Sequence, residues 1–120
     1  VFDVGQFVPI QYSAALALRM SSYIDEVAQK YKIKMEKAQK ILRDKGYQTY
    51  SSNAAFFIWI KLPEGFTSSE QYMHKVWEDK KVLLMPGIGF GENGEGYFRI
   101  STTSPMELIE EGLNRLDKIK

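Results

Sequence analysis

The residues best suited to chemistry in this sequence follow a glycine-rich loop. Residues 85–101, MPGIGFGENGEGYFRIS, hold five of the chain's nine glycines and lead into a strand-like run that carries Arg99. Alternation along YFRIS places Phe98 and Ile100 on one face and Arg99 on the other. A guanidinium presents a planar fork of N–H donors that matches a carboxylate through two parallel hydrogen bonds. Arg99 is therefore a candidate anion clamp; the alternative is an arginine that pairs with a nearby glutamate or snorkels from the sheet.

The same glycines also spell a dinucleotide-binding pattern, which the surrounding sequence argues against. Gly89, Gly91 and Gly94 form G-x-G-x-x-G after a predicted strand. In the true fingerprint a helix begins within the motif, and its amides hold a pyrophosphate. Here the chain enters a strand instead, and two glutamates in the loop would repel a phosphate. The glycines rather predict positive-φ turns and a close approach of main chain to a ligand or another domain.

The composition excludes several kinds of site. The chain has no cysteine, so thiolate catalysis, disulfides and zinc–thiolate centres are excluded, and we expect a reducing, cytoplasmic setting. His74 is the only histidine, which rules out a multi-histidine metal site. The formal net charge of +1 provides no general attraction for nucleic acid. No apolar run is long enough to span a bilayer. We expect no metal, nucleic-acid or membrane partner.

Two helices are predicted before the strands. Pro9 in a first turn, followed by IQYSAALAL, predicts a helix near residues 9–22. From Ser22 onward, apolar residues recur every three or four positions opposite a lysine-rich face, which predicts a long amphipathic helix that ends at Gly46. Acidic residues are interspersed among these lysines, so we interpret the charged face as solvated.

The remaining elements alternate between strands and helices. AFFIWIKLP predicts a strand over about residues 55–63, and KVLLM over 81–85 predicts a short buried one. Thr67 and Glu70 form a predicted capping box for a helix that runs to about Lys80. We expect that helix to bury Met73, Val76 and Trp77. Ser104 is likewise the expected cap of a C-terminal helix that buries Ile109, Gly112, Leu113 and Leu116.

This order of elements predicts an α+β fold. The expected architecture is a two-layer small domain, in which helices cover one face of a mostly antiparallel sheet of three to four strands, with a long helix before it. Residues 1–22 are expected to form a loop and helix that link to a missing large domain, and residues 23–120 the small domain itself. Because the chain opens abruptly at VFDVG without methionine, we treat it as a possible fragment.

The motifs together resemble a known family. PGIGFGENGEGYFRIS, LPEGFTSSEQYMHKVWEDKKVLLMPG and DVGQFVPIQYSAALAL resemble the C-terminal part of class I/II pyridoxal-phosphate-dependent aminotransferases of fold type I, closest to the LL-diaminopimelate aminotransferase branch. The resemblance covers essentially the whole chain. Its most specific element combines Pro86-Gly87, Phe90-Gly91, Gly94-x-Gly96 and Arg99-Ile100-Ser101.

The resemblance implies roles for a few residues. Arg99 would bind the α-carboxylate of an amino acid or 2-oxo acid substrate, and Pro86 and Gly87 would border the same pocket. Asn53, in SSNAAFFIW, resembles a position in the diaminopimelate branch and is a further substrate-binding candidate, although an asparagine before a strand is also a common turn residue. Gly5 and Gln6 would lie near the active site, whereas Val4 replaces a serine frequent in relatives.

The resemblance also implies what this chain would not contain. The lysine that anchors pyridoxal phosphate, and the residues that tune its ring and hold its phosphate, would lie upstream, so we expect no catalytic or cofactor-binding residue here. The parent would be a cytoplasmic homodimer, and this chain alone would be inactive and bind no cofactor. A C–S lyase or an α-oxoamine synthase would keep a similar arginine. A free-standing carboxylate-binding module, or a protein-interaction domain using Phe57 and Trp59, remains an alternative.

Overall fold

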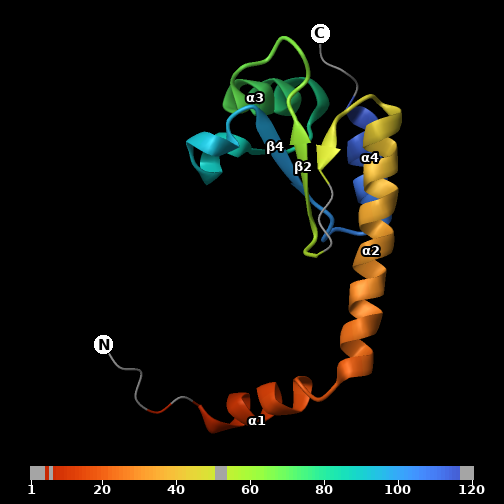
Figure 1. Cartoon of the computed structure of the whole chain (residues 1–120), viewed down its shortest axis with the longest axis vertical. Coiled ribbons are helices and arrows are strands. Elements are labelled where there is room, and N and C mark those ends of the chain that lie inside the picture. The colour runs from red at the N-terminus through yellow and green to blue at the C-terminus, as the bar shows by residue number, and fades with distance from the viewer. Residues whose placement is uncertain (1–4, 6, 51–53, 117–120) are drawn as a thin grey trace. The chain divides into compact units, whose positions relative to one another are not determined.

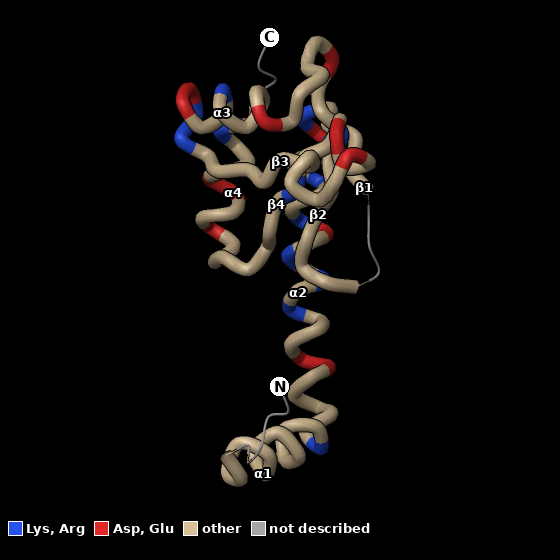
Figure 2. Tube along the Cα trace, turned by 90° about the vertical axis from the view of Figure 1, so that its left-hand side faces the viewer, with Lys and Arg blue, Asp and Glu red and all other residues tan. Residues whose placement is uncertain are grey.

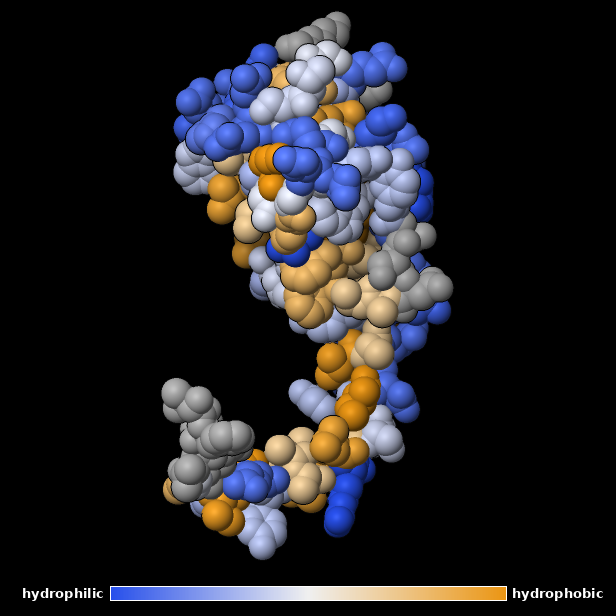
Figure 3. All heavy atoms as spheres, turned by 60° about the vertical axis from the view of Figure 1, so that its left-hand side comes forward, coloured by the Kyte–Doolittle hydropathy of each residue, from blue (hydrophilic) through white to orange (hydrophobic). Residues whose placement is uncertain are grey.

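The computed structural model describes residues 5, 7–50 and 54–116. The chain divides into two compact units, residues 1–30 and 31–120 (Figure 1). The first unit holds α1 (Val8–Ala17), with Pro9 in its first turn as predicted, and the beginning of α2 (Ser21–Asp44). No residue of α1 is buried, although most of its residues are apolar, and Figure 3 shows hydrophobic atoms exposed along the visible face of this helix. A helix of that kind is usually covered by other polypeptide. The domain boundary predicted at residue 22 stays a prediction.

The rest of α2 is the amphipathic helix that the periodicity predicts. Met35, Ala38 and Leu42 are buried, and basic and acidic residues are interspersed along the helix (Figure 2). The helix ends as expected at Gly46, whose φ of 80° is in the left-handed region and whose N–H donates to the Arg43 carbonyl over 2.8 Å.

The second unit contains a four-stranded antiparallel sheet in the order β1-β2-β4-β3. Its strands are β1 (Thr49–Tyr50), β2 (Phe57–Lys61), β3 (Met85–Pro86) and β4 (Tyr97–Ser101). The α+β class is confirmed. The predicted strand over 81–85 is wrong for most of its length, because Lys81 adopts a φ of 56° and closes the preceding helix. The two-residue β1 was not predicted, since so short a strand leaves no alternation to detect.

Helices α2, α3 (Ser69–Lys80) and α4 (Met106–Arg115) pack on one face of this sheet. The core contains side chains from all three helices and from β2 and β4, including Leu42, Ile58, Ile60, Tyr72, Val76, Phe98, Ile109, Leu113 and Leu116. Two predicted inward positions, Val76 and Met73, pack in or against it. Trp77 does not, being 48% exposed.

Tyr72 is a core residue of α3 that the sequence analysis did not predict. Its side chain is fully buried, and its hydroxyl lies 2.9 Å from the hydroxyl of Tyr47. Burial, together with this hydrogen bond, raises the pKa of Tyr72 far above its ordinary value. A tyrosine can replace an apolar residue in the core here because its polar tip has a partner.

No helix of the described residues is long and apolar enough to cross a membrane. Within the same part of the chain, no three acidic, histidine or cysteine side chains gather where they could hold a metal ion. His74 is exposed on α3.

Candidate functional site

Arg99 lies in the middle of the sheet, on the face that the helices leave open. In β4 it pairs with Trp59 of β2 on one side and Met85 of β3 on the other. Its neighbours Phe98 and Ile100 point to the helices, as the alternation predicts, with Phe98 fully buried and Ile100 packed against the core. The guanidinium forms no ion pair with any carboxylate of the described residues. Among the described residues, Arg99 is therefore not neutralised by a glutamate, as the alternative had it.

Two phenylalanine rings hold the Arg99 guanidinium. Its carbon Cζ lies 3.9 Å from the ring centre of Phe57 and 4.3 Å from that of Phe90. Phe57 belongs to β2, and Phe90 ends the turn that follows β3, so the rings come from the elements on either side of β4. We call Phe57 and Phe90 the aromatic clamp. Cation–π attraction of this kind stabilises a guanidinium without neutralising it, which leaves its N–H donors to a ligand.

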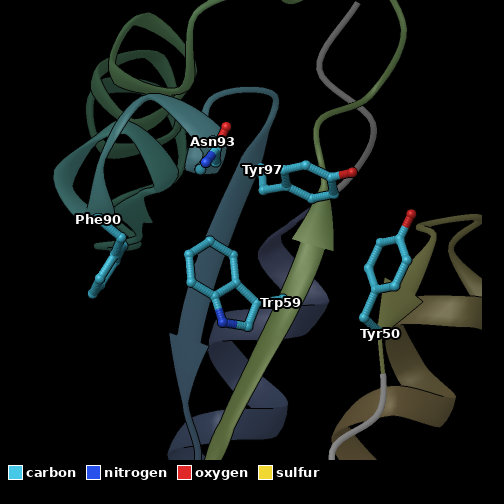
Figure 4. Close-up of a pocket in the computed structure, with 6 residues that line it drawn as sticks. Tyr50, Trp59, Phe90, Asn93 and Tyr97 are labelled. Carbon is cyan, nitrogen blue, oxygen red and sulfur yellow. The ribbon is translucent and has the colours of Figure 1, made fainter.

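An aromatic pocket lies beside the clamp on the same open face. It has a volume of about 420 Å³, and its lining residues are Tyr50, Trp59, Phe90, Asn93, Gly94 and Tyr97. Figure 4 shows the Trp59 ring between Phe90 and Tyr97, with Tyr50 across the sheet. The ring centres of Trp59 and Phe90 lie 5.2 Å apart in an edge-to-face arrangement, so Phe90 contributes to both the pocket and the clamp.

The glycine loop owes its shape to a close contact between two backbones. Residues Gly87–Phe90 and Glu92–Gly94 form two short 3₁₀ turns. A Cβ on Gly87 would lie 1.9 Å from the carbonyl oxygen of Gly94, and a Cβ on Gly94 would lie 2.1 Å from that of Gly87. Both positions therefore require glycine for space. This close backbone contact is made within the loop itself, and the predicted approach to a ligand or another domain stays a prediction.

Several amides of the glycine loop already have acceptors, so they are not available to cradle a phosphate. The N–H of Gly91 donates to the Ile88 carbonyl, and the N–H of Gly94 donates to the Gly91 carbonyl. The N–H of Gly96 donates to the Glu95 carboxylate over 2.9 Å. Phosphate-binding loops instead direct free amides at the ligand. These contacts add a second argument against a dinucleotide site, and its absence stays a prediction.

Glu95 ties the loop to the N-terminus of α3. Its carboxylate accepts from the backbone N–H of Ser69 over 2.6 Å as well as from Gly96, and Ser69 Oγ accepts from the N–H of Ile88 over 3.2 Å. The helix cap itself is Ser68, whose hydroxyl accepts from the Gln71 N–H. The predicted capping box of Thr67 and Glu70 is therefore wrong, because the cap lies one residue later than predicted. The acidic residue that accepts from the N-terminus of α3 is instead Glu95, which lies 26 positions after Ser69.

The C-terminal helix is also displaced by one residue from its prediction. Pro105 is the cap of α4 and makes no side-chain capping bond, and Ser104 instead offers its carbonyl to Lys34 Nζ over 2.8 Å. Ile109, Leu113 and Leu116 are buried as expected.

A pH-dependent effect follows from the Glu95 contacts. The hydrogen bonds from Gly96 and Ser69 lower the pKa of Glu95 in the folded chain. A lowered pKa stabilises the fold above the ordinary glutamate pKa of about 4.3, and this contribution is lost as the pH falls through the folded-state value. We expect Glu95→Gln to lower the free energy of unfolding at neutral pH and to have a much smaller effect in acid. Urea unfolding at several pH values measures the difference.

Glu92→Gln is the matched control for that measurement. Glu92 is exposed in the adjacent turn, and among the described contacts its carboxylate accepts no hydrogen bond from α3. A Glu95→Gln penalty that stays constant from neutral to acid pH would show that the charge of Glu95 does not stabilise this junction.

The structure describes two of the other predicted site residues, Pro86 and Gly87. Pro86 pairs with Phe98 at the end of β3, directly after the Met85 that pairs with Arg99. Gly87 is buried and its backbone lies against that of Gly94, and neither Gly87 nor Pro86 lines the aromatic pocket. Asn53 lies outside the described residues. Substrate binding by these residues stays a prediction.

Sequence reasoning missed the aromatic clamp. Period-two alternation does place Phe57, Trp59 and Arg99 on one face, so half of the clamp could have been found. Phe90 belongs to a loop with no regular period, and nothing local indicates where its ring lies.

The chain matches known proteins over almost its full length. Residues 7–116 match the family described as aminotransferase class I and II. The LL-diaminopimelate aminotransferase of Aquifex aeolicus is 35% identical over 98% of this chain and 30% of its own length. The aromatic-amino-acid aminotransferase 2 of Thermococcus litoralis is 33% identical over 92% of this chain and 29% of its own. The chain thus spans about 30% of the length of the curated relatives it matches.

Solved structures lead to the same family. An aminotransferase from Staphylococcus aureus superposes with a TM-score of 0.88 at 27% identity, over 95% of this chain and 30% of that one. An aromatic aminotransferase from Pyrococcus horikoshii OT3 gives 0.82 at 31% identity, over 88% of this chain and 29% of that one. The chain belongs to the aminotransferase class I and II family.

Proposed function

We propose that this chain is the C-terminal small domain of a pyridoxal-phosphate-dependent aminotransferase, in which Arg99 binds the α-carboxylate of the amino acid and 2-oxo acid substrates. The observation that carries the proposal is a guanidinium on the open sheet face that has two aromatic neighbours and no ion-pair partner among the described residues. Family membership supports the reaction class. A cationic fork on a rigid strand is a suitable receptor for a planar anion.

The residues described do not fit pyridoxal phosphate itself. In the complete enzyme this cofactor supplies the electron sink for amino transfer and needs a lysine and a phosphate site from the protein. The loop amides of Gly91 and Gly94 donate within the loop and that of Gly96 donates to Glu95, so these three are not free to hold a phosphate. The open face around Arg99 is aromatic. We therefore place the groups that hold the cofactor in polypeptide outside this chain, which spans about 30% of its relatives' length.

In this proposal the small domain binds the substrate and orients it. Arg99 fixes the carboxylate end of the substrate, which reduces the orientations available to the rest of the molecule before reaction. The aromatic pocket beside it presents an apolar wall. The carbon chemistry takes place on residues and a cofactor supplied from elsewhere in the enzyme.

The division of labour gives a direct test. Supplied with pyridoxal phosphate, an amino acid and a 2-oxo acid, the 120-residue chain alone should form no more transamination product than the same mixture without protein, because the groups that hold the cofactor lie elsewhere. Product analysis measures the transfer, and mass spectrometry after borohydride reduction measures cofactor attached to protein. The complete enzyme that contains this domain is the positive control. Amino transfer by the chain alone, or stoichiometric attachment of the cofactor to one of its lysines, would overturn the proposal.

A further inference from the structure

We propose that the aromatic clamp of Phe57 and Phe90 makes the Arg99 site selective for a planar carboxylate over a tetrahedral oxyanion. The inference rests on the proposed function of Arg99 and adds two positioning residues, which act through the arginine. It concerns the shape of the anion that the site accepts.

The clamp restricts the directions from which an anion can reach Arg99. With ring centres 3.9 Å and 4.3 Å from Cζ, both rings lie in van der Waals contact with the guanidinium. They belong to elements on either side of β4. A ligand oxygen cannot occupy the space that a ring already fills. The remaining approach is along the guanidinium edge, where the N–H donors point.

The shape of the anion then decides how well it fits. The two oxygens of a carboxylate lie in one plane and meet the fork in that plane. A sulfonate or phosphonate has a third oxygen that leaves the plane when the other two are bound. Within the clamp this oxygen would be directed at the space that an aromatic ring occupies. The rings therefore penalise a tetrahedral anion more than a planar one.

Several contacts hold the clamp in place. Phe90 packs edge-to-face on Trp59, with ring centres 5.2 Å apart. The turn that carries Phe90 is fixed to α3 by the hydrogen bond from the Ile88 N–H to Ser69 Oγ. Phe57 lies within β2 and contacts Phe56 at 4.5 Å between ring centres. The guanidinium is thus ordered before a ligand arrives, which avoids part of the entropic cost of immobilising a long side chain.

The clamp can be observed directly in the unmodified chain. Protons that lie over an aromatic face shift upfield, so the δ and ε protons of Arg99 in the 120-residue chain should resonate upfield of those of the exposed Arg43 and Arg115 in an NMR spectrum. Ordinary arginine shifts at position 99 would show that the clamp does not form, and would overturn the inference without any variant.

The selectivity is tested in the complete enzyme with two small anions of equal charge. Acetate is planar at its charged end and methanesulfonate is tetrahedral, so their inhibition constants against the amino-acid substrate give a shape preference. We expect Phe90→Leu to reduce the ratio of the methanesulfonate to the acetate inhibition constant about three- to tenfold, which is about 0.7–1.4 kcal/mol, because the space that the ring denies to a third oxygen becomes free. Phe90 is 45% exposed, so its replacement should leave the fold intact. Phe90→Tyr keeps the ring and should keep the ratio.

Two further variants separate the possible outcomes. Ile88→Val changes an exposed side chain of the same turn, keeps the backbone bond to Ser69 and should leave the ratio unchanged. Arg99→Lys should weaken both inhibitors. If Arg99→Lys weakens both and Phe90→Leu leaves the ratio at its wild-type value, the clamp inference fails and the proposed function stands. If Arg99→Lys leaves both inhibition constants unchanged, the proposed function and the inference fail together.

Discussion

Replacing Arg99 with lysine in the complete enzyme should reduce kcat/KM for α-amino acid donors roughly 10- to 100-fold. Lysine keeps the positive charge, but a compact ammonium cannot make the two parallel hydrogen bonds of a guanidinium fork. A hydrogen bond to a charged partner contributes about 1.5–3 kcal/mol, and each 1.4 kcal/mol corresponds to a factor of ten. The ammonium would also lose the contacts that the guanidinium makes with the rings of Phe57 and Phe90. Steady-state kinetics with each substrate measure the loss.

Arg115→Lys is the matched control for this experiment. Arg115 is an exposed arginine on α4 that pairs with Glu111 one helical turn earlier, away from the open face of the sheet. Its exchange for lysine should leave kcat/KM unchanged, because surface pairs of this kind contribute little. If Arg99→Lys is as active as Arg115→Lys, Arg99 does not bind the substrate carboxylate.

Replacing Gly87 with alanine should lower the free energy of unfolding of the 120-residue chain by about 3 kcal/mol, at the upper end of the range for overpacking. The new Cβ would lie 1.9 Å from the carbonyl oxygen of Gly94 and 2.5 Å from that of Tyr97. Both obstacles are backbone atoms, so no side chain can rotate away to make room. The loop must separate from itself and from the start of β4. Urea denaturation followed by circular dichroism measures the change.

Gly89→Ala is a matched control two residues away in the same turn. No atom lies within 4 Å of a Cβ placed there, and Gly89 is not in the left-handed region. Its stability change should stay within about 0.5 kcal/mol. Gly94→Ala should behave like Gly87→Ala, because its Cβ would lie 2.1 Å from the Gly87 carbonyl oxygen. Equal stability of the Gly87 and Gly89 variants would contradict the backbone contact.

The two experiments examine connected parts of one site. Gly87 begins the turn that Phe90 ends, and Phe90 stacks on Arg99. A variant at Gly87 that folds in the complete enzyme should therefore also disturb carboxylate binding. We therefore expect the glycine spacing to act on Arg99 indirectly, by fixing where the Phe90 ring lies.

The sequence alone was enough to predict most of the regular elements and the face of Arg99. The three- and four-residue period of α2 and its end at Gly46 follow from neighbours along the chain, and so does the alternation of β2 and β4. Trp77 and Tyr72 show the limit of that reasoning. Both are large aromatic residues on α3, and only the packing of the sheet and the nearby Tyr47 hydroxyl decides which one is buried.

Short-range patterns were therefore enough to predict the class of the fold and the candidate arginine, and composition alone excluded cysteine chemistry. The tertiary structure decided what surrounds that arginine. Glu95 reaches Ser69 across 26 residues, Ile88 reaches the same serine across 19, and Phe90 arrives over Arg99 from a loop without a period. Such contacts depend on how the sheet and helices pack. Periodicity along a chain reports which face a residue occupies, whereas the neighbours it meets there are set by elements distant in sequence.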